Sequence, residues 1–431
     1  MKLGWLQIVR LGLVQMCLGA VVVLTTSTLN RLMVVELALP AVLPGALVAL
    51  HYGIQITRPN WGFHSDTRGN RTAFIIGGMG ALALGAFLAA LAVVILPTAG
   101  TAGLLLSVLA YALIGVGVGA SGTSLLALLA TATADHRRAA AATITWLMMI
   151  FGIAVTAGTV GAFLDPYTPA LLLKIVGIVT VGAVVLTVLA VWGIERRVIA
   201  ERESEAASFR QGLAEVWSEP RARNFTLFIF LSMTAYFLQE LILEPYAGLV
   251  FGFSPGQSTQ LSGAQNGGVF VGMLAVGFAA TGLRVGSLRH WVMAGCSGSA
   301  MALLAIAVLG QLQIGLLVPA VVLLGVFNGM FAVAAIGSMM ALAGEGRGAR
   351  EGTRMGLWGA AQALAAGFGG LLGTAAVDLI RFWTDVPTAF GLVFTAEAGL
   401  FVVAAMIAAR VIDHRRGGAN PAASAIAVPG E

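Results

Sequence analysis

A long stretch without charge limits how this chain can fold more than any other feature. Between Thr72 and Ala134 the sequence has no Asp, Glu, Lys or Arg, and most of its residues are apolar. A helix needs roughly 20 such residues to cross the hydrocarbon core of a bilayer. Pro97 and Gly100 divide the stretch near its middle. The uncharged stretch therefore predicts two consecutive transmembrane helices.

The composition extends this prediction to the whole chain. Of its 431 residues, 58% are hydrophobic and only 10% are charged, and the mean hydropathy is +0.93. Soluble domains carry about 25% charged residues. The first apolar run lacks a small-residue cleavage site and is followed by further spans, so it is not a cleaved signal peptide. We therefore expect an all-α, multi-pass membrane protein.

Glycines, prolines and charge clusters divide the apolar regions into individual spans. This division predicts twelve spans: 11–31, 41–58, 73–96, 102–133, 140–162, 169–193, 224–245, 261–283, 291–310, 314–342, 355–377 and 387–410. With the N-terminus inside, all but three of the 24 Lys and Arg residues fall on the cytoplasmic side. The exceptions are Arg31, Lys174 and Arg381. Because basic residues collect in cytoplasmic loops, both termini are predicted to be cytoplasmic.

An internal repeat divides the spans into two sets. Similar residues recur at a shift of about 210 positions, among them Trp146, Gly158 and Gly161 in the first copy and Trp358, Gly370 and Gly373 in the second. Chance matching among glycine-rich helices is the alternative. Two parallel six-helix halves are the layout of the major facilitator fold. The predicted parts are a half at 1–193, a cytoplasmic linker with an amphipathic helix at 194–223, a half at 224–413 and a tail at 414–431.

The loop between the second and third spans carries a spaced set of glycines and charges, Gly62, Asp66, Gly69 and Arg71. This set resembles the major facilitator signature loop. A carboxylate there can accept hydrogen bonds from free N–H groups at a helix start and pair with arginines. Thr67 departs from the usual pattern, which has a basic residue. A solvated loop that merely follows the charge rule is the alternative.

Few ionisable residues lie at mid-membrane depth, where pumps and symporters usually place them. The predicted spans at 102–133 and 314–342 carry no charge. The candidate functional polar residues are Glu240, Glu244, Glu397, Asn328 and Gln362. This set suits a bulky apolar ligand, or no transported ligand at all.

His51 is the one histidine within a predicted span. A neutral imidazole can ligate a metal, including the magnesium of a chlorophyll-type pigment. The alternative is a histidine that forms hydrogen bonds inside the helix bundle. The other histidines are too scattered along the chain for a metal cluster, and no protein-held metal site is expected.

Two segments, "TLNRLMVVELALPAVLPGALVALHYGIQ" at 28–55 and "LQELILEPYAGLVFG" at 238–252, are more specific than the loop. With the loop, they resemble the PucC/LhaA family, a bacteriochlorophyll-delivery branch of the major facilitator superfamily in phototrophic bacteria. The resemblance implies an assembly factor that delivers bacteriochlorophyll, or chaperones light-harvesting polypeptides, in the intracytoplasmic photosynthetic membrane. It also implies bacteriochlorophyll synthase and antenna or reaction-centre assembly intermediates as possible partners.

Two other classes of function compete with this one. A secondary transporter of a small apolar compound would use the same fold, and fold alone cannot decide between them. An enzyme is not expected, because no nucleophile–base set or metal-ligand spacing is recognisable. The distribution of basic residues is explained by topology, so we expect membrane lipids and no nucleic acid as partners.

Overall fold

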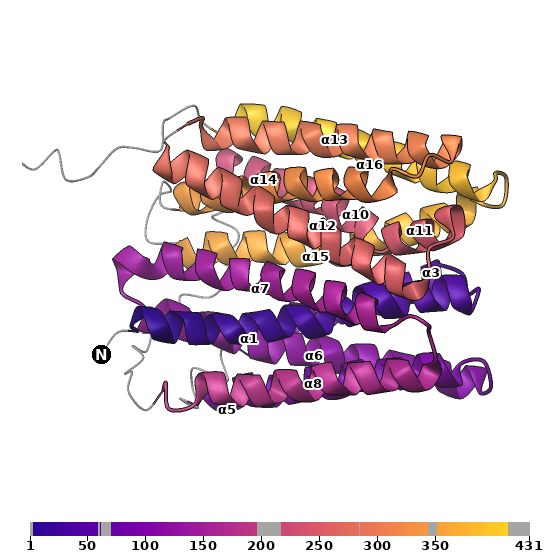
Figure 1. Ribbon diagram of the computed structural model, residues 1–431. Coiled ribbons are helices and arrows are strands. Elements are labelled where there is room, and N and C mark those ends of the chain that lie inside the picture. The colour runs from indigo at the N-terminus through magenta and orange to yellow at the C-terminus, as the bar shows by residue number, and fades with distance from the viewer. Residues whose placement is uncertain are drawn as a thin grey trace, which may run out of the picture.

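The computed structural model describes residues 3–58, 61, 70–195, 217–283, 285–343 and 351–412. Within these ranges the secondary structure is helical, and the long helices run side by side as one bundle (Figure 1). The predicted all-α class is therefore confirmed. The linker helix predicted around 209–217 and the tail at 414–431 lie almost wholly outside the described residues.

The first and seventh spans are each built from several helical pieces. The first combines α1 (Trp5–Val23), a π-helix at Leu24–Thr28, α2 (Leu29–Arg31) and a second π-helix at Leu32–Glu36. The second span is α3 (Val42–Ile54) with a short 3₁₀ turn at Gln55–Thr57. The seventh consists of α10 (Pro220–Glu240) and α11 (Leu243–Phe251).

The other spans are continuous α-helices over most of their length, with one further π-helix at Phe278–Gly282 after α12. They are α5 (Arg71–Ile95), α6 (Gly100–Ala132), α7 (Asp135–Phe163), α8 (Pro169–Val191), α12 (Pro255–Gly277), α13 (Leu288–Leu312), α14 (Leu317–Ala343), α15 (Glu351–Ile380) and α16 (Val386–Val411).

Eleven of the described helical segments are long and apolar enough to cross a membrane, and Val42–Thr57 is a shorter apolar helix. Each predicted span falls on one of these twelve segments. The full count of twelve spans and the cytoplasmic position of the termini remain predictions. The first span begins earlier and ends later than predicted, at Trp5 and Glu36. Its polar residues between Thr25 and Arg31 are buried.

Cap residues followed by proline fix three helix starts on one side of the bundle. Thr168 caps α8, Ser254 caps α12 and Asp385 caps α16, and a proline occupies the first or second position of each helix. Proline suits this position because the first N–H groups of a helix have no intrahelical partner. Hydrogen bonds from Thr388 lower the pKa of the Asp385 carboxyl.

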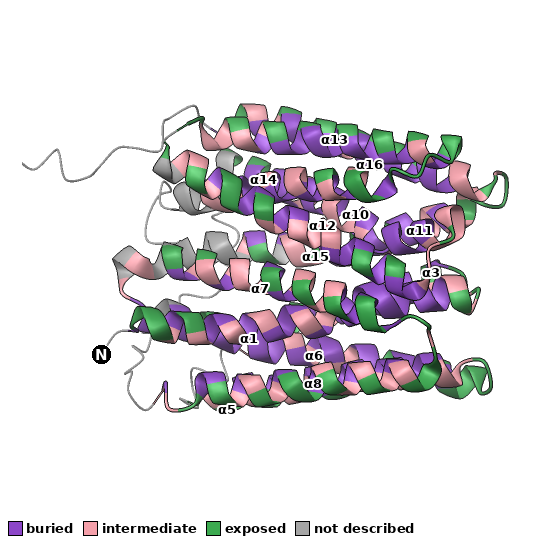
Figure 2. Cartoon of the chain, viewed as in Figure 1, coloured by how far each residue is buried: buried purple, intermediate pink, exposed green. Residues whose placement is uncertain are grey.

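The helices form two hydrophobic cores that meet along a seam. One core consists mainly of buried residues between Leu3 and Ile194, and the other of buried residues between Phe225 and Ile412. Two helix pairs connect them, α7 with α12 and α3 with α15. Figure 1 shows α7 and α15 lying between the two sets, and Figure 2 shows buried residues along the faces between helices. The division of the chain at 193/194 and 223/224 stays a prediction.

Close backbone contacts hold the seam together. A Cβ on Gly256 of α12 would lie 2.5 Å from the carbonyl oxygen of Gly161 in α7, and one on Gly45 of α3 would clash with Thr374 of α15. Side chains larger than hydrogen at these two glycines would force the helices apart. We call the end of the bundle opposite the N-terminus the far end; the charge rule predicts that it is the non-cytoplasmic side.

Candidate functional site

The two sequence segments that carry the family resemblance meet at the far end of the seam. Asn30 of α2 donates a hydrogen bond from Nδ2 to the carbonyl oxygen of Leu241, 2.7 Å away. This carbonyl lies at the break between α10 and α11, where the helical hydrogen-bond ladder is interrupted. The buried amide of Asn30 therefore satisfies a buried backbone group that the break would otherwise leave unpaired.

Arg31 makes the widest set of contacts at this end. Its side chain is only 2% exposed. Its Nη2 donates to the carbonyl oxygen of Phe253 at 2.7 Å, its Nε donates to Ser258 Oγ at 3.3 Å, and its Nη1 lies 2.5 Å from Glu36 Oε1. An arginine can satisfy several acceptors at once because its guanidinium carries five N–H donors. Arg31 thus joins the first span to the loop and helix start that follow α11.

Glu244, the second residue of α11, is also in contact with the first span. Its carboxylate accepts a hydrogen bond from the hydroxyl of Ser27, and Glu244 is buried. Thr28 Oγ1 lies 3.3 Å from Thr259 Oγ1 of α12. We call the residues Ser27, Thr28, Asn30 and Arg31, with Leu241, Glu244, Phe253, Ser258 and Thr259, the far-end clasp.

Tyr246 fixes the clasp to the C-terminal core. Its hydroxyl donates to the carbonyl oxygen of Ile306 at 2.7 Å, and its ring lies 5.0 Å from that of Phe394. Glycine at position 310 leaves room for the hydroxyl, since a Cβ there would overlap it. The motif from Leu243 to Gly248 thus holds the C-terminal core through its tyrosine and the first span through its glutamate.

Two further carboxylates cross the seam at the far end. Asp165, which follows α7, accepts hydrogen bonds from the Ser254 hydroxyl and from the Gly256 N–H at 3.1 Å. Asp378 near the end of α15 accepts from the N–H of Val42 at 2.7 Å. Each carboxylate lies at the start of a helix in the opposite half, where free N–H groups and the helix dipole favour negative charge.

The π-helices of the first span explain how its polar residues reach the clasp. Each π-turn inserts one extra residue and shifts the helix face that follows it. The two π-segments, Leu24–Thr28 and Leu32–Glu36, flank Asn30 and Arg31 directly. Such bulges are frequent at functional sites, and here the extra residues turn the polar side of "TSTLNR" toward α11 and α12.

Glu240 lies deeper in the bundle than the clasp. It is half-buried, it lies beside the Thr26 hydroxyl, and Tyr236 is close to it on the same helix. An aromatic contact crosses the seam nearby, since the Tyr52 ring of α3 lies 5.7 Å from that of Phe237. The break after Glu240 thus places Glu240 and Glu244, which are four positions apart in the sequence, in different surroundings.

His51 lies inside the N-terminal core. It is 1% exposed, its ring is stacked on Tyr52 at 4.6 Å, and neither ring nitrogen has a hydrogen-bond partner among the described residues. Its backbone packs against Gly115 of α6. Because the ring is buried, a pigment magnesium could reach it only after the surrounding helices moved.

The remaining predicted polar residues do not join the clasp. Glu397 is fully buried in the C-terminal core, and neither carboxylate oxygen has a hydrogen-bond partner in the described part of the chain. Asn328 is also buried and accepts a 2.8 Å hydrogen bond from Ser299. Gln362 is half-buried on α15. The structure therefore brings only Glu244, and more distantly Glu240, to the far end of the seam.

The signature loop lies mostly outside the described residues, which include neither Gly62, Asp66 nor Gly69. Arg71 begins α5, and its N–H donates to Glu195 Oε1 at 2.9 Å. The next N–H, of Thr72, donates to Glu195 Oε2, also at 2.9 Å. Glu195, from the turn after α8, thus accepts two N–H groups at this helix start. The predicted role of Asp66 stays a prediction.

Sequence reasoning therefore missed most of the clasp and Glu195. One signal was available, because Arg31 is among only three basic residues predicted on the non-cytoplasmic side. An unexpected charge beside an asparagine inside an apolar helix indicates a buried partner. Asp165 and Asp378 gave no comparable signal, since single acids at helix ends are ordinary in loops.

Comparisons with known proteins agree with this arrangement. The family model described as "PUCC protein" matches residues 28–416. A Rhodobacter capsulatus protein named bacteriochlorophyll synthase 44.5 kDa chain is 72% identical over 416 residues, which is 96% of this chain and 97% of that protein. Protein PucC of the same species is 28% identical, over 96% of this chain and 93% of its own length.

Solved structures show the fold. A peptide transporter crystallised with sulfate superimposes with a TM-score of 0.67 at 15% identity, covering 95% of this chain and 96% of that one. At this identity the likeness concerns the fold alone. Together with the two helix sets and their seam, it confirms the transporter-type fold of the major facilitator class.

Proposed function

This chain belongs to the PucC family, and from this membership we propose that it is a non-enzymatic assembly factor for photosynthetic antenna complexes. In this proposal it delivers bacteriochlorophyll, or chaperones light-harvesting polypeptides, within the bacterial inner membrane. The observation that supports it most is the family match from residue 28 to residue 416, which spans both helix sets and both sides of the clasp. The relative named as a bacteriochlorophyll synthase chain connects the same sequence to this pigment.

The chemistry of the described residues supports an apolar cargo. Arg31 is paired with Glu36 and bonds to the Phe253 carbonyl, and the Glu244 carboxylate accepts a hydrogen bond from Ser27, so these groups already have partners within the protein. Helix α6 carries no charged residue, and neither does α14. A polar substrate in such a bundle would lose water without gaining ionic partners. A large apolar pigment needs mainly apolar helix faces and close packing.

The name of the close relative raises the alternative of catalysis. In our proposal the chain works beside the synthase and does not itself join the pigment to its tail. Among the described residues there is no group of three His, Cys, Asp or Glu able to hold a metal ion. An assay of the purified protein with pigment precursor, prenyl donor and magnesium should give no product, whereas adding the synthase should give it.

The second candidate function is a secondary transporter of a small apolar compound. The likeness to solved transporters favours it, and the clasp is the kind of contact that could open and close. The two functions predict different phenotypes. Deleting the gene in a phototroph should lower an antenna complex without changing pigment-free membrane proteins. A strain with normal antenna, and no paralogue to compensate, would contradict the assembly role.

His51 remains our candidate for a direct pigment ligand. Its two unpartnered ring nitrogens support this proposal, while its burial requires helix movement before a pigment could bind. In a complemented deletion strain, His51→Phe should reduce the pigment recovered with the protein. Unchanged pigment content would show that His51 is not a pigment ligand, and it would not contradict the assembly role.

A further inference from the structure

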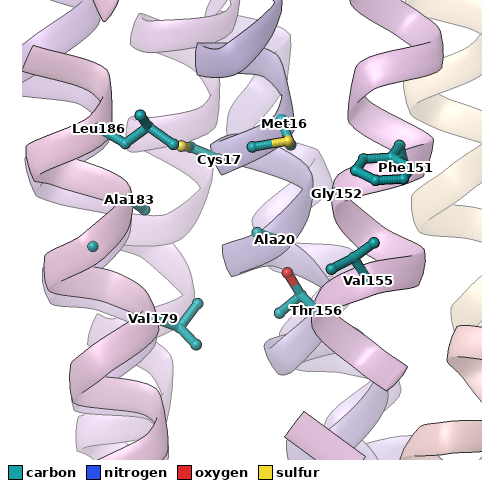
Figure 3. Close-up of a pocket in the computed structure, with 11 residues that line it drawn as sticks. Met16, Cys17, Ala20, Phe151, Gly152, Val155, Thr156, Val179, Ala183 and Leu186 are labelled. Carbon is teal, nitrogen blue, oxygen red and sulfur yellow. The ribbon is translucent and has the colours of Figure 1, made fainter. Parts of the chain in front are cut away.

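A cavity on the membrane-facing side of the N-terminal helices lies outside the site described above. It has a volume of about 220 Å³ and is enclosed by α1, α7 and α8 (Figure 3). Ala20, Gly182 and Ala183 line it with small side chains, while Gly152 lets the backbone of α7 approach Met16 of α1 closely. Gly182 is exposed and a Cβ built on it would meet no atom within 4 Å, so the cavity is accessible from the lipid side.

This cavity adjoins the seam between the two halves. Phe151 lines it from α7, is 46% exposed, and places its ring 5.8 Å from that of Phe270 in α12. Ile150 on the same helix packs with Val269 and Met273 of α12. The exposed Phe151 and the half-buried Phe270 therefore form an aromatic pair beside the cavity, where α7 and α12 join the halves.

One polar group faces the cavity. Figure 3 shows the hydroxyl oxygen of Thr156 directed toward Ala20. In the described part of the chain this hydroxyl has no hydrogen-bond partner, whereas that of Thr159 donates to the carbonyl of Val155 at 2.7 Å. A threonine in a membrane helix usually satisfies its hydroxyl in the way Thr159 does. The free donor indicates a ligand that brings its own acceptor.

The depth of Thr156 helps to identify that ligand. It lies seven residues before Phe163, where α7 and the apolar span both end, which places it roughly 10 Å along the helix from that end at 1.5 Å per residue. The ester groups of phospholipids lie outside the hydrocarbon core, at the interface. A phospholipid could place only its acyl chain here, so it would leave the hydroxyl unpaired. A mostly apolar ligand whose ester lies within the core could satisfy it.

Building on the function proposed above, we propose that this cavity binds the ester-linked hydrocarbon tail of bacteriochlorophyll. The flat macrocycle lies against Phe151 and Phe270, the ester carbonyl accepts a hydrogen bond from Thr156, and the tail fills the space beside Gly182. The cavity equals roughly seven water molecules at about 30 Å³ each, so it accommodates part of a chain and not a macrocycle. A pigment bound there touches both halves at the seam.

Binding measurements on the full-length protein in nanodiscs test this proposal. The probes are bacteriochlorophyll and bacteriochlorophyllide, which has the same macrocycle but no tail. Gly182→Leu places a large side chain at the lipid-side edge of the cavity, where the tail would enter, and it should weaken bacteriochlorophyll binding at least tenfold while changing bacteriochlorophyllide binding less than twofold. The matched control is Gly399→Leu on α16, an exposed glycine that likewise has no atom within 4 Å of a built Cβ; it should change neither. Equal weakening of both pigments by Gly182→Leu would overturn the proposal.

Thr156→Val removes only the hydroxyl and keeps the side-chain shape. It should weaken bacteriochlorophyll binding about fivefold, as expected for one hydrogen bond. If this variant left bacteriochlorophyll binding unchanged, Thr156 would not bind the ester, and the proposed pose would be contradicted.

Photo-crosslinking separates a failure of this site from a failure of the pigment-delivery function. Diazirine-bearing phytol and diazirine-bearing phosphatidylcholine are compared as probes in the same nanodiscs. Phytol should label the residues lining the cavity more than the exposed face of α16, and Gly182→Leu should abolish the excess. This result would support a tail site even if the wild-type protein bound no intact pigment. Equal labelling of the cavity by both probes would identify an ordinary lipid groove and overturn the proposal.

Discussion

Asn30 and Leu241 are 211 positions apart in the chain, and the side-chain amide of the first donates a 2.7 Å hydrogen bond to the backbone carbonyl of the second. The bond joins the two segments by which the sequence resembles the PucC family. Around it, Ser27 and Arg31 bond to Glu244 and to the Phe253 carbonyl. The most family-specific residues therefore hold the two halves together at one end of the bundle.

Replacing Asn30 with leucine should destabilise the protein by about 1–3 kcal/mol, because the buried carbonyl of Leu241 would lose its partner. The measurement is the thermal unfolding midpoint of the purified protein in detergent. Asn266→Leu is the matched control, since Asn266 donates only to the carbonyl of Ser262 in its own helix. Equal shifts of the unfolding midpoint in the two variants would mean that the hydrogen bond across the seam stabilises the protein no more than a bond within one helix does.

Replacing Arg31 with methionine should open the far end. The change removes the contacts of Arg31 to Phe253 and Ser258. A cysteine introduced at the fully buried Thr259, in a background without the two native cysteines, reports the opening. A membrane-impermeant thiol reagent applied from the far side should react at least tenfold faster with this cysteine in Arg31→Met. Arg381→Met, which alters an exposed loop arginine, should leave the rate unchanged. The same rate in all three proteins would contradict a closed clasp.

Glu195→Gln should destabilise the start of α5 by about 1–2 kcal/mol, because a carboxylate that accepts two N–H groups at a helix start acts as a cap. Asp66→Asn tests the signature loop in the same way and should lower membrane levels of the protein or impair antenna assembly. Glu219→Gln is the control for both, since it neutralises a carboxylate that directly precedes a different helix, α10. If Glu195→Gln, Asp66→Asn and Glu219→Gln all left stability and membrane levels unchanged, the charges of the signature loop would serve only to set the membrane topology.

Glu397→Gln should be tolerated, with a loss of less than about 1 kcal/mol. The carboxyl group has no hydrogen-bond partner to lose among the described residues, and glutamine keeps its volume. In proteoliposomes under an imposed pH gradient, the wild-type protein should show no substrate-dependent proton flux. A robust flux that Glu397→Gln abolishes would favour the transporter alternative.

Most of the fold could be predicted from the sequence, because a bilayer permits few kinds of backbone structure. A chain that must satisfy its backbone internally in the bilayer forms helices or a closed barrel, and the uncharged runs are long enough for helices. The tryptophan and glycines that recur about 210 positions later in the sequence then indicated two similar halves. The bent first span was not predicted, because nothing in "LTTST" distinguishes a π-turn from an α-turn.

The site was predicted less well, because its bonds join residues more than 200 positions apart. Glu244 was identified as an unusual acid in an apolar segment, but its partner Ser27 has an ordinary sequence context. Two of the nine clasp residues, Leu241 and Phe253, take part through backbone carbonyls, which every residue possesses. Only the break after Glu240 makes the Leu241 carbonyl available, and that break is visible in the structure alone.

The most direct test of the assembly role is the composition of the protein purified gently from a phototrophic membrane. Absorbance spectra and mass spectrometry of the purified sample should show bacteriochlorophyll together with light-harvesting polypeptides or the synthase. The detergent must leave pigment bound to the antenna complexes of the same membranes. Recovery of the protein without pigment and without either partner, under those conditions, would contradict the role we propose.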